Sequence, residues 1–345
     1  MSERCHGACQ FEVRAVSVRR RIVAAMTNSA IMASGLKKAY KDTVVLDGID
    51  LDVRAGTVFS LLGPNGAGKT TTVNVLTTLL RMDGGTARVA GYDVATEPKK
   101  IRSSIGVTGQ FASVDELLSG RENLQLMADL HRLKSSEGKS VVEHLLRRFE
   151  LEESADKQSS TYSGGMRRKL DLAMTLVGRP QIIFLDEPTT GLDPRSRRTM
   201  WNIVRELVAD GMTIFLTTQY LDEADQLADK IAVLDHGRLV AEGAPDQLKR
   251  QIPGGHVQLR FPAAAQLDAA LHVLPGSAPD TDSLILRVPS DGAVQSLRNL
   301  LERLDEYAID VEEFTVQMPD LDDVFLALTA DSSAPAESEM EVITT

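Results

Sequence analysis

The chain has 345 residues, which is enough for about two domains of ordinary size. Its composition, 43% hydrophobic and 25% charged, is that of a globular protein and excludes wholesale disorder and fibrous repeats. The formal net charge is −11, so the chain lacks the overall basic field that holds nucleic acid, and we expect no nucleic-acid partner.

The N-terminal region does not read as a membrane segment. Its longest uncharged stretch, residues 22–36, is interrupted by polar residues, whereas a spanning helix needs about 20 mostly apolar residues. Three arginines precede residues 22–26, but this apolar core is too short for a signal peptide. We therefore expect a flexible leader at residues 1–30, with Met26 or Met32 as an alternative first residue.

Short apolar runs alternate with helical patterns from residue 31 to about residue 250, which predicts an α/β domain with a parallel sheet. The runs that predict strands are 44–53, with a possible turn at 47–48, 57–62, 182–185 and 213–217. The patterns that predict helices are 70–80 and 196–209. Leucines at helical spacing also predict a helical subdomain at about residues 114–165.

A second, smaller α/β domain is expected at residues 256–330, after a turn-rich linker at 251–255. Its predicted strands are 257–261, 284–288 and 311–316, and its predicted helices are 266–274, 293–304 and 321–328. The last residues, 331–345, contain acidic residues but no Lys or Arg, which predicts a disordered acidic tail.

A phosphate-binding loop is predicted where a strand gives way to a helix, because the sequence Gly-Pro-Asn-Gly-Ala-Gly-Lys-Thr fits the pattern G-x-x-x-x-G-K-[ST]. Glycines let successive backbone N–H groups point at a phosphate chain. Lys69 then supplies a cation to the β- and γ-phosphates, and the Thr70 hydroxyl can bind Mg²⁺. A glycine-rich turn without function is the alternative. The nucleotide-binding residues expected here are Gly63, Pro64, Asn65, Gly66, Ala67, Gly68, Lys69, Thr70 and Thr71.

Two carboxylates follow the predicted strand at 182–185. A buried parallel strand delivers them to the carboxyl edge of the sheet, where the phosphate loop also lies. We expect Asp186 to hold Mg²⁺ and Glu187 to polarise the attacking water. The alternative is a pair of solvated acids at a strand end.

The segment Tyr-Ser-Gly-Gly-Met at residues 162–166, followed by an arginine-rich helix, resembles the signature motif of ATP-binding cassette (ABC) ATPases. The usual form is L-S-G-G-Q, so Tyr162 and Met166 depart from it. Ser163, Gly164 and Gly165 remain, and a hydroxyl with bare backbone amides at a helix start suits a γ-phosphate.

Other landmarks of that family follow in order over about residues 31–248, and their roles are those that the resemblance implies. Tyr40 matches the aromatic residue that stacks on adenine, with an ordinary strand residue as the alternative. Gln110 matches the glutamine that senses Mg²⁺ and contacts the transmembrane partner. Residues 191–193, Gly-Leu-Asp, match the D-loop.

Gln219 stands where most ABC ATPases have the switch histidine. Its amide can still donate a hydrogen bond to the γ-phosphate, but it cannot become a cation. Together with residues 162–168 and 319–329, this replacement resembles the daunorubicin/doxorubicin-resistance (Drr) subfamily. That resemblance implies a peripheral ATPase that energises separate membrane permeases exporting hydrophobic drugs or lipids.

The fold class expected is therefore α/β: a P-loop NTPase of ABC type with a helical subdomain, plus the small C-terminal α/β domain. The resemblance implies ATP and Mg²⁺ as cofactors, with Lys69, Glu187 and Gln219 as catalytic residues. It also implies a head-to-tail pair of ATPase subunits, in which Ser163 of one completes the site of the other. The permease would be another chain, with this protein at the cytoplasmic face of the cell membrane.

Three alternatives remain open. An importer ATPase has a similar cassette. A non-transport ABC ATPase acting on DNA or ribosomes is disfavoured, because Ser163 follows Lys69 by only 94 residues and a single phosphate loop is present. A pure binding module is disfavoured by Glu187.

Overall fold

The computed structural model describes residues 29–330, except 111, 251–254, 282, 292 and 318–319. The expected leader, the acidic tail and most of the expected linker lie outside these residues. The chain divides into two compact units between Glu242 and Gly243. This division precedes the expected boundary at 250, because helix α9 (Pro245–Lys249) contacts helix α12 (Leu321–Ala330) of the second unit.

The first unit is built on a six-stranded sheet in the order β10-β9-β3-β8-β7-β6. Its strands are β3 (Val58–Leu62), β6 (Ile105–Thr108), β7 (Ile182–Asp186), β8 (Thr213–Thr218), β9 (Lys230–Asp235) and β10 (Arg238–Gly243). β3 pairs in parallel with β8 and β9, and β7 pairs in parallel with β6 and β8. This parallel sheet confirms the expected α/β fold.

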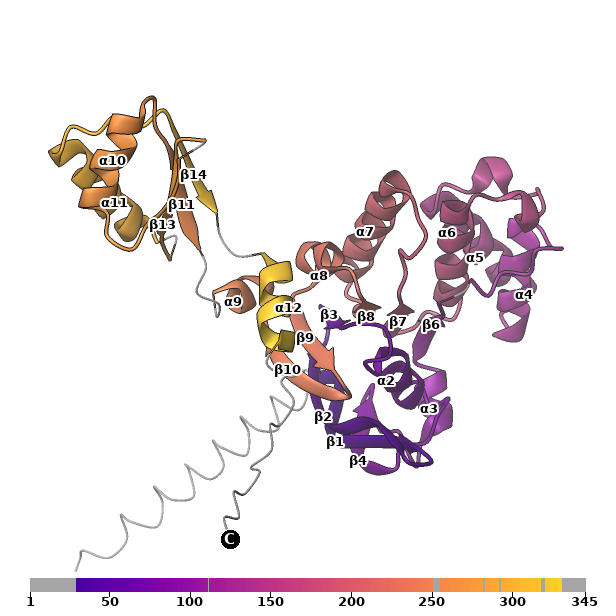
Figure 1. Ribbon diagram of the computed structural model, residues 1–345. Helices are drawn as coiled ribbons and strands as arrows, with labels where there is room; N and C mark the ends of the chain where they lie inside the picture. Colours follow the sequence, from indigo (N-terminus) through magenta and orange to yellow (C-terminus); the bar gives the residue numbers. More distant parts are fainter. Residues whose placement is uncertain are drawn as a thin grey trace, which may run out of the picture. The chain divides into compact units, whose positions relative to one another are not determined.

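Helices cover both faces of this sheet (Figure 1). They are α2 (Lys69–Leu76) on one face, and α6 (Gly164–Leu176), α7 (Pro194–Ala209) and α8 (Leu221–Leu227) on the other. Strand β7 shows why both faces are apolar, since Phe184 belongs to the core around α2 while Ile183 and Leu185 belong to the core around α6 and α7. A strand buried on both faces reads as a continuous apolar run, which is how the sequence predicted it.

A second sheet, antiparallel, packs on the far side of α2 (Figure 1). Its order is β2-β1-β4-β5, formed by β1 (Ser29–Tyr40), β2 (Thr43–Arg54), β4 (Gly84–Val89) and β5 (Tyr92–Asp93). β2 continues through the possible turn at 47–48. β4 was not expected, because only Ala87 and Val89 of its residues are buried and the apolar signal is weak.

The helical region contains α4 (Gly120–Leu130) and α5 (Ser135–Arg148), which pack with α6 around buried side chains such as Phe149. α4 starts at a capping box in which Ser119 and Glu122 satisfy each other's backbone N–H groups. A short helix α3 (Pro98–Arg102) precedes β6, and two 3₁₀ turns, Glu152–Ser154 and Ser159–Thr161, lead into α6. Among the residues that the structure describes, no helix is long and apolar enough to cross a membrane.

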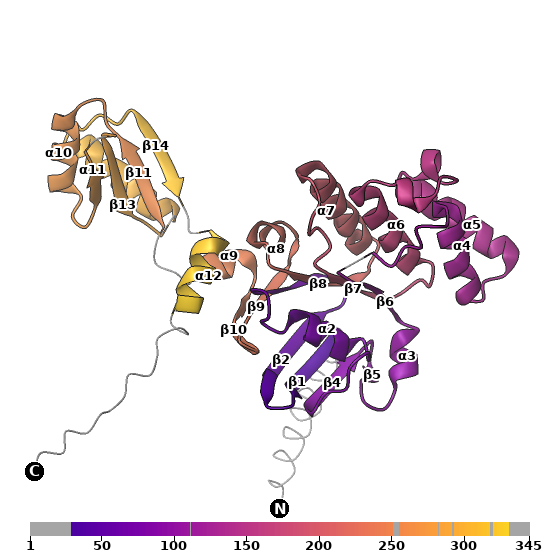
Figure 2. The same ribbon diagram turned by 45° about the vertical axis from the view of Figure 1, so that its right-hand side comes forward.

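Between α9 and α12, the second unit has a β-α-β-β-α-β succession. Its elements are β11 (His256–Arg260), α10 (Ala264–Val273), β12 (Ala278–Asp280), β13 (Ile285–Pro289), α11 (Val294–Glu306) and β14 (Glu313–Gln317). The sheet is antiparallel with order β12-β13-β11-β14, and α10 and α11 lie on one of its faces (Figure 2). Apolar residues of both helices and of the inner strands form its core.

The turn between β9 and β10 packs against the loop that follows β3. The Gly237 N–H donates to the Ala67 carbonyl (3.1 Å), and the Asp47 N–H donates to the Gly237 carbonyl (2.9 Å). Gly237 has φ +74°, and a Cβ there would lie 2.4 Å from the Val45 carbonyl oxygen. The turn therefore holds the expected phosphate loop from behind, at a position that only glycine fits.

We expect Gly237→Ala to destabilise the first unit more than Gly91→Ala does. Gly91 has a similar φ of +79° but open space around it, so alanine there costs only the backbone strain of about 1–3 kcal/mol. Alanine at Gly237 adds a steric clash with β2. Urea unfolding followed by the fluorescence of Trp201, the single tryptophan, measures both losses. Equal losses would mean that the turn does not pack rigidly on β2.

Candidate functional site

The predicted site segments follow neighbouring parallel strands of the six-stranded sheet. In the strand order β3-β8-β7-β6, the loop 63–70 follows β3, Gln219 follows β8, Asp186 and Glu187 end β7, and Gln110 follows β6. Carboxyl ends of parallel strands meet at one edge of a sheet. The fold therefore brings these segments to one edge, where the Gly63 N–H donates to the Thr218 carbonyl (3.2 Å).

The loop at 63–70 needs glycine at two positions for different reasons. At Gly63 a Cβ would lie 2.2 Å from the Leu234 carbonyl oxygen, so the backbone is too close to β9 for a side chain. Gly68 has φ +110° and caps the start of α2. Both positions keep the loop closely wound ahead of the helix N-terminus, where N–H groups are free to bind an anion.

Lys69 is buried inside this loop, with only 4% of its surface exposed. Its Nζ donates to the Gly63 carbonyl (2.7 Å) and the Pro64 carbonyl (3.0 Å), and lies 3.4 Å from Glu187 Oε1. Burial lowers the pKa of the Lys69 ammonium, and the Glu187 carboxylate opposes that shift. The cation therefore lies within the predicted phosphate loop, where anionic phosphate oxygens would be stronger hydrogen-bond acceptors for it than the two neutral carbonyls.

Glu187 and Asp186 are positioned by Thr217 on the neighbouring strand. Asp186 pairs with Thr217 in the β7–β8 register, and the Thr217 hydroxyl donates to Asp186 Oδ1. The Glu187 N–H donates to the Thr217 carbonyl (3.1 Å). Glu187 has φ +48°, a left-handed conformation that non-glycine residues rarely adopt. Such strain is typical of functional positions. Thr217 was not predicted as a site residue, because its position opposite Asp186 follows from the β7–β8 pairing.

The expected metal residues offer oxygen donors only. Thr70 and Gln110 are exposed, whereas Asp186 is buried at 4% exposure. No group of three or more His, Cys, Asp or Glu side chains in the described part of the chain could hold a metal ion by itself. A hydroxyl, an amide oxygen and one carboxylate nevertheless fit Mg²⁺, which binds hard oxygen ligands and keeps water and substrate phosphates as further ligands.

Ser163 and Gly164 are exposed and Gly165 is half-buried at the start of α6, where Ser163 Oγ accepts the Met166 N–H (3.2 Å). A Cβ at Gly164 would lie 3.8 Å from the Leu192 side chain, so this segment adjoins the expected D-loop. Within the residues that the structure describes, no hydrogen bond joins Ser163 to the loop 63–71. The hydrogen bonds of the described residues therefore do not connect the signature segment to the phosphate loop of the same chain.

Tyr162, the departure from the usual leucine, is buried, and its hydroxyl donates to the Ser154 carbonyl (2.6 Å). It also fits closely against Gly120, where a Cβ would lie 2.3 Å from the phenol oxygen. The tyrosine therefore anchors the start of α6 to the helical region. The tyrosine at position 162 therefore has a structural role and does not use the Ser163 hydroxyl.

The predicted adenine-stacking residue, Tyr40, ends β1 with 49% of its surface exposed. The Lys38 ammonium lies 5.6 Å from its ring centroid. Gln219 is half-buried directly after β8. No hydrogen bond or ion pair among the described residues ties either side chain to the phosphate loop, so both roles stay predictions.

Glu223 is a residue of this region that the sequence analysis did not assign. It lies on α8, just after Gln219, with no exposed surface. Its Oε1 accepts hydrogen bonds from Thr189 Oγ1 (2.8 Å) and Trp201 Nε1 (3.1 Å). Burial raises the pKa of the Glu223 carboxyl, and its hydrogen bonds oppose that shift. This carboxyl joins the helix after Gln219 to the segment after Glu187.

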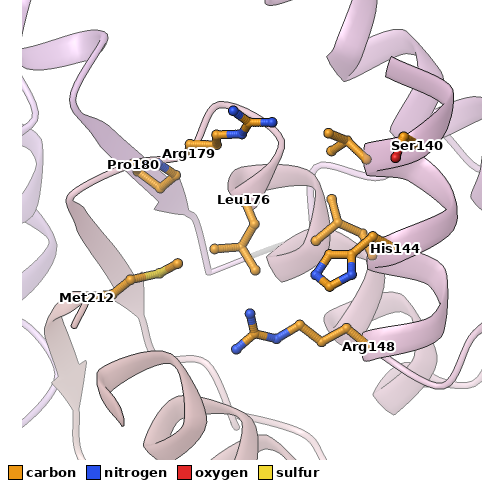
Figure 3. Close-up of a pocket in the computed structure, with 9 residues that line it drawn as sticks. Ser140, His144, Arg148, Leu176, Arg179, Pro180 and Met212 are labelled. Atoms are coloured by element: carbon orange, nitrogen blue, oxygen red, sulfur yellow. The ribbon is translucent and has the colours of Figure 1, made fainter. Parts of the chain in front are cut away.

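A separate hollow lies between α5 and the end of α6 (Figure 3). His144 and Arg148 of α5 face Leu176 and Met212 across it, and Arg148 also binds Asp210 (2.6 Å). None of the predicted site residues lines this hollow. The chemistry predicted from the sequence therefore belongs to the sheet edge and not to this cavity.

Comparison with known proteins identifies similar ones over nearly the whole chain. A family model described as ABC transporter matches residues 46–190. The daunorubicin resistance ATP-binding protein DrrA3 of Streptomyces coeruleorubidus is 47% identical over 91% of this chain and 100% of that protein. The doxorubicin resistance ATP-binding protein DrrA of Mycobacterium tuberculosis is 42% identical over 90% of this chain and 95% of that protein. A solved dimeric ATP-binding cassette with ADP and Pi is 25% identical, covers 62% of this chain and 98% of that chain, and has a TM-score of 0.57.

The buried Glu223 carboxyl predicts a pH-dependent stability. The pKa of the Glu223 carboxyl is higher in the folded chain than in the unfolded chain. The stability that this group contributes is therefore fully present at a pH below its pKa in the unfolded chain, and it is lost as the pH rises through its pKa in the folded chain. We expect the free energy of unfolding of Glu223→Gln, relative to the wild type, to increase from about pH 5 to about pH 8. Glu206→Gln, at an exposed position of α7, is the control. A difference that stays constant with pH would show that the Glu223 carboxyl does not titrate in this range.

Proposed function

The chain belongs to the ATP-binding proteins of ABC transporters, and from this premise we propose that it powers the export of hydrophobic drugs or lipids by a separate membrane permease. Members of this family are ATPases that drive transport, and this chain is one of them. The proposed direction and cargo are supported by two relatives, 47% and 42% identical, which are daunorubicin and doxorubicin resistance proteins. The observation that carries the proposal is the buried approach of Lys69 to Glu187, at 3.4 Å, on a sheet edge shared by the other site segments.

In this proposal the loop 63–71 binds the ATP phosphates through its N–H groups and Lys69, and Tyr40 stacks on the adenine. Thr70, Asp186 and Gln110 hold Mg²⁺, whose charge offsets that of the phosphates. Glu187 orients the attacking water and accepts its proton. The Gln219 amide donates to the γ-phosphate and compensates the charge that develops there.

We propose that two copies pair head to tail, so that Ser163 and the glycines after it complete the partner's ATP site. Support comes from the exposed position of Ser163, which is not joined to its own phosphate loop, and from the dimeric form of a solved relative with ADP and Pi. ATP then holds the two copies together, and hydrolysis lets them separate. This movement drives the permease between its inward and outward states.

The proposed location is the cytoplasmic face of the cell membrane, where the chain is held by permease subunits near Gln110. The test of the transport function is accumulation of lipophilic cations by cells that contain the permease together with this chain or its Glu187→Gln variant. We expect less accumulation with the wild-type chain. Unchanged accumulation across a broad panel of drugs would contradict export.

Replacing Glu187 by Gln should leave ATP binding intact, because the residues of the loop 63–71 all remain and the ATP phosphates replace the lost carboxylate as the charged partner of Lys69. It should remove most of the turnover. Without hydrolysis, ATP should hold the chain as a stable dimer. ATPase rates and size-exclusion chromatography with and without ATP measure both effects. Hydrolysis at the wild-type rate would show that Glu187 is not the base.

Gln219→Ala should lower turnover by about a hundredfold, since loss of one donor to a transition-state charge costs about 3 kcal/mol. Gln219→His should retain substantial activity, because an imidazole N–H can donate along a similar direction. It should also add a titration near neutral pH. ATPase rates against pH for the three proteins measure this. Full turnover per folded molecule in the alanine variant would remove Gln219 from the site and leave it a structural residue at the strand end.

A further inference from the structure

Arg168 is a buried cation at the centre of the first unit, with 7% of its surface exposed. It lies on α6 and reaches the backbone of two other segments. Its Nε donates to the Pro188 carbonyl (2.9 Å) and its Nη2 to the Asp186 carbonyl (3.1 Å). Its Nη1 donates to the Gly109 carbonyl (2.7 Å). The guanidinium therefore binds the backbone on both sides of Glu187 and directly before Gln110.

Asp171, one turn further along α6, completes this arrangement. Its Oδ2 accepts from Arg168 Nη1 (3.2 Å), and its Oδ1 accepts the Ser113 N–H (2.9 Å). Asp171 is 3% exposed. Because Gly109 and Ser113 lie on either side of the segment that begins with Gln110, the ion pair binds both ends of that segment.

The chemistry of the guanidinium suits this role. Burial of a charge is costly unless a partner and hydrogen bonds compensate it, and here one carboxylate and three carbonyls do so. A guanidinium has five N–H donors in a planar fork. An ammonium is a compact point charge on a flexible stem and cannot reach three diverging carbonyls in the same way.

We propose that Arg168, held by Asp171, is a positioning residue for ATP turnover, which fixes the backbone around Glu187 and the segment of Gln110 in one geometry. Its own contacts are to backbone and to Asp171, so it acts through the residues that meet the nucleotide. The proposal rests on the roles given to Glu187, Asp186 and Gln110 in the proposed function. It adds that the alignment of the water-orienting and metal-binding groups depends on one side chain of α6.

The test compares Arg168→Lys with Arg205→Lys, the same change at an exposed position of α7 where the guanidinium binds the Gln226 carbonyl (3.1 Å). We expect Arg168→Lys to lower kcat at least about tenfold, the scale on which small misplacement of catalytic groups acts. Affinity for a fluorescent ATP analogue without Mg²⁺ should stay within about twofold, because the loop 63–70 is untouched. The Mg²⁺ concentration for half-maximal turnover should rise at least about threefold, because Asp186 and Gln110 are both displaced. The control should change none of these.

Two results would overturn the proposal: an unchanged kcat, or a loss of activity that matches the loss of folded protein with the Mg²⁺ dependence unchanged. If Arg168→Lys does not fold, Asp171→Asn replaces it, because the asparagine oxygen can still accept the Ser113 N–H while its NH₂ group removes both the charge and the acceptor that Arg168 uses. It should shift kcat and the Mg²⁺ dependence in the same directions, and unchanged values would again contradict the proposal. Absence of ATP hydrolysis by the wild-type chain would instead contradict the proposed function, so the two failures are distinct.

Discussion

The alignment of four parallel strands is the constraint on which the rest of the first unit depends. β3, β8, β7 and β6 end at one edge because each is hydrogen-bonded to its neighbour in fixed register, as in the pairing of Asp186 with Thr217. Separate apolar cores on the two faces hold that register, since a slip by one residue would turn every side chain to the opposite face. The position of Lys69 beside Glu187 therefore depends on the packing of both apolar cores, which extend well beyond the site itself.

The features that were predicted best from the sequence are those that depend on residues adjacent in the chain. The buried strands at 57–62, 182–185 and 213–217 were evident because a strand covered on both faces reads as an apolar run. The phosphate loop was evident because its glycines and Lys69 are contiguous. β4 was missed because it is half-exposed, and β9 and β10 were not assigned. Arg168 and Glu223 were not identified as parts of the site region, because the carbonyls that Arg168 binds and the side chains that bind Glu223 lie 18 or more residues away in the sequence and meet them only in the folded chain.

Buried charge is the common feature of the residues that surround the site. Lys69 faces Glu187, Arg168 faces Asp171, and Asp186 accepts from Thr217, and all six side chains are buried. Removing one member of such a pair leaves the other uncompensated at low dielectric, which is far more costly than losing an exposed ion pair. The stability of the first unit and the geometry of its site therefore rest on the same few side chains.

Helix α6 has a consequence for the proposed pair of copies. Ser163, which in that proposal serves the partner's nucleotide, caps the start of this helix, and Arg168 follows five residues later, about 7.5 Å further along the axis. In the proposed pair, the start of α6 would therefore contact the partner's ATP, while Arg168 on the same helix binds the backbone around the chain's own Glu187. If the pair forms as proposed, we expect a displacement of Ser163 to reach Glu187 through Arg168, so that hydrolysis of one nucleotide affects hydrolysis of the other. In a mixed pair with one inactive copy, the intact copy would then run at a rate set by its disabled neighbour.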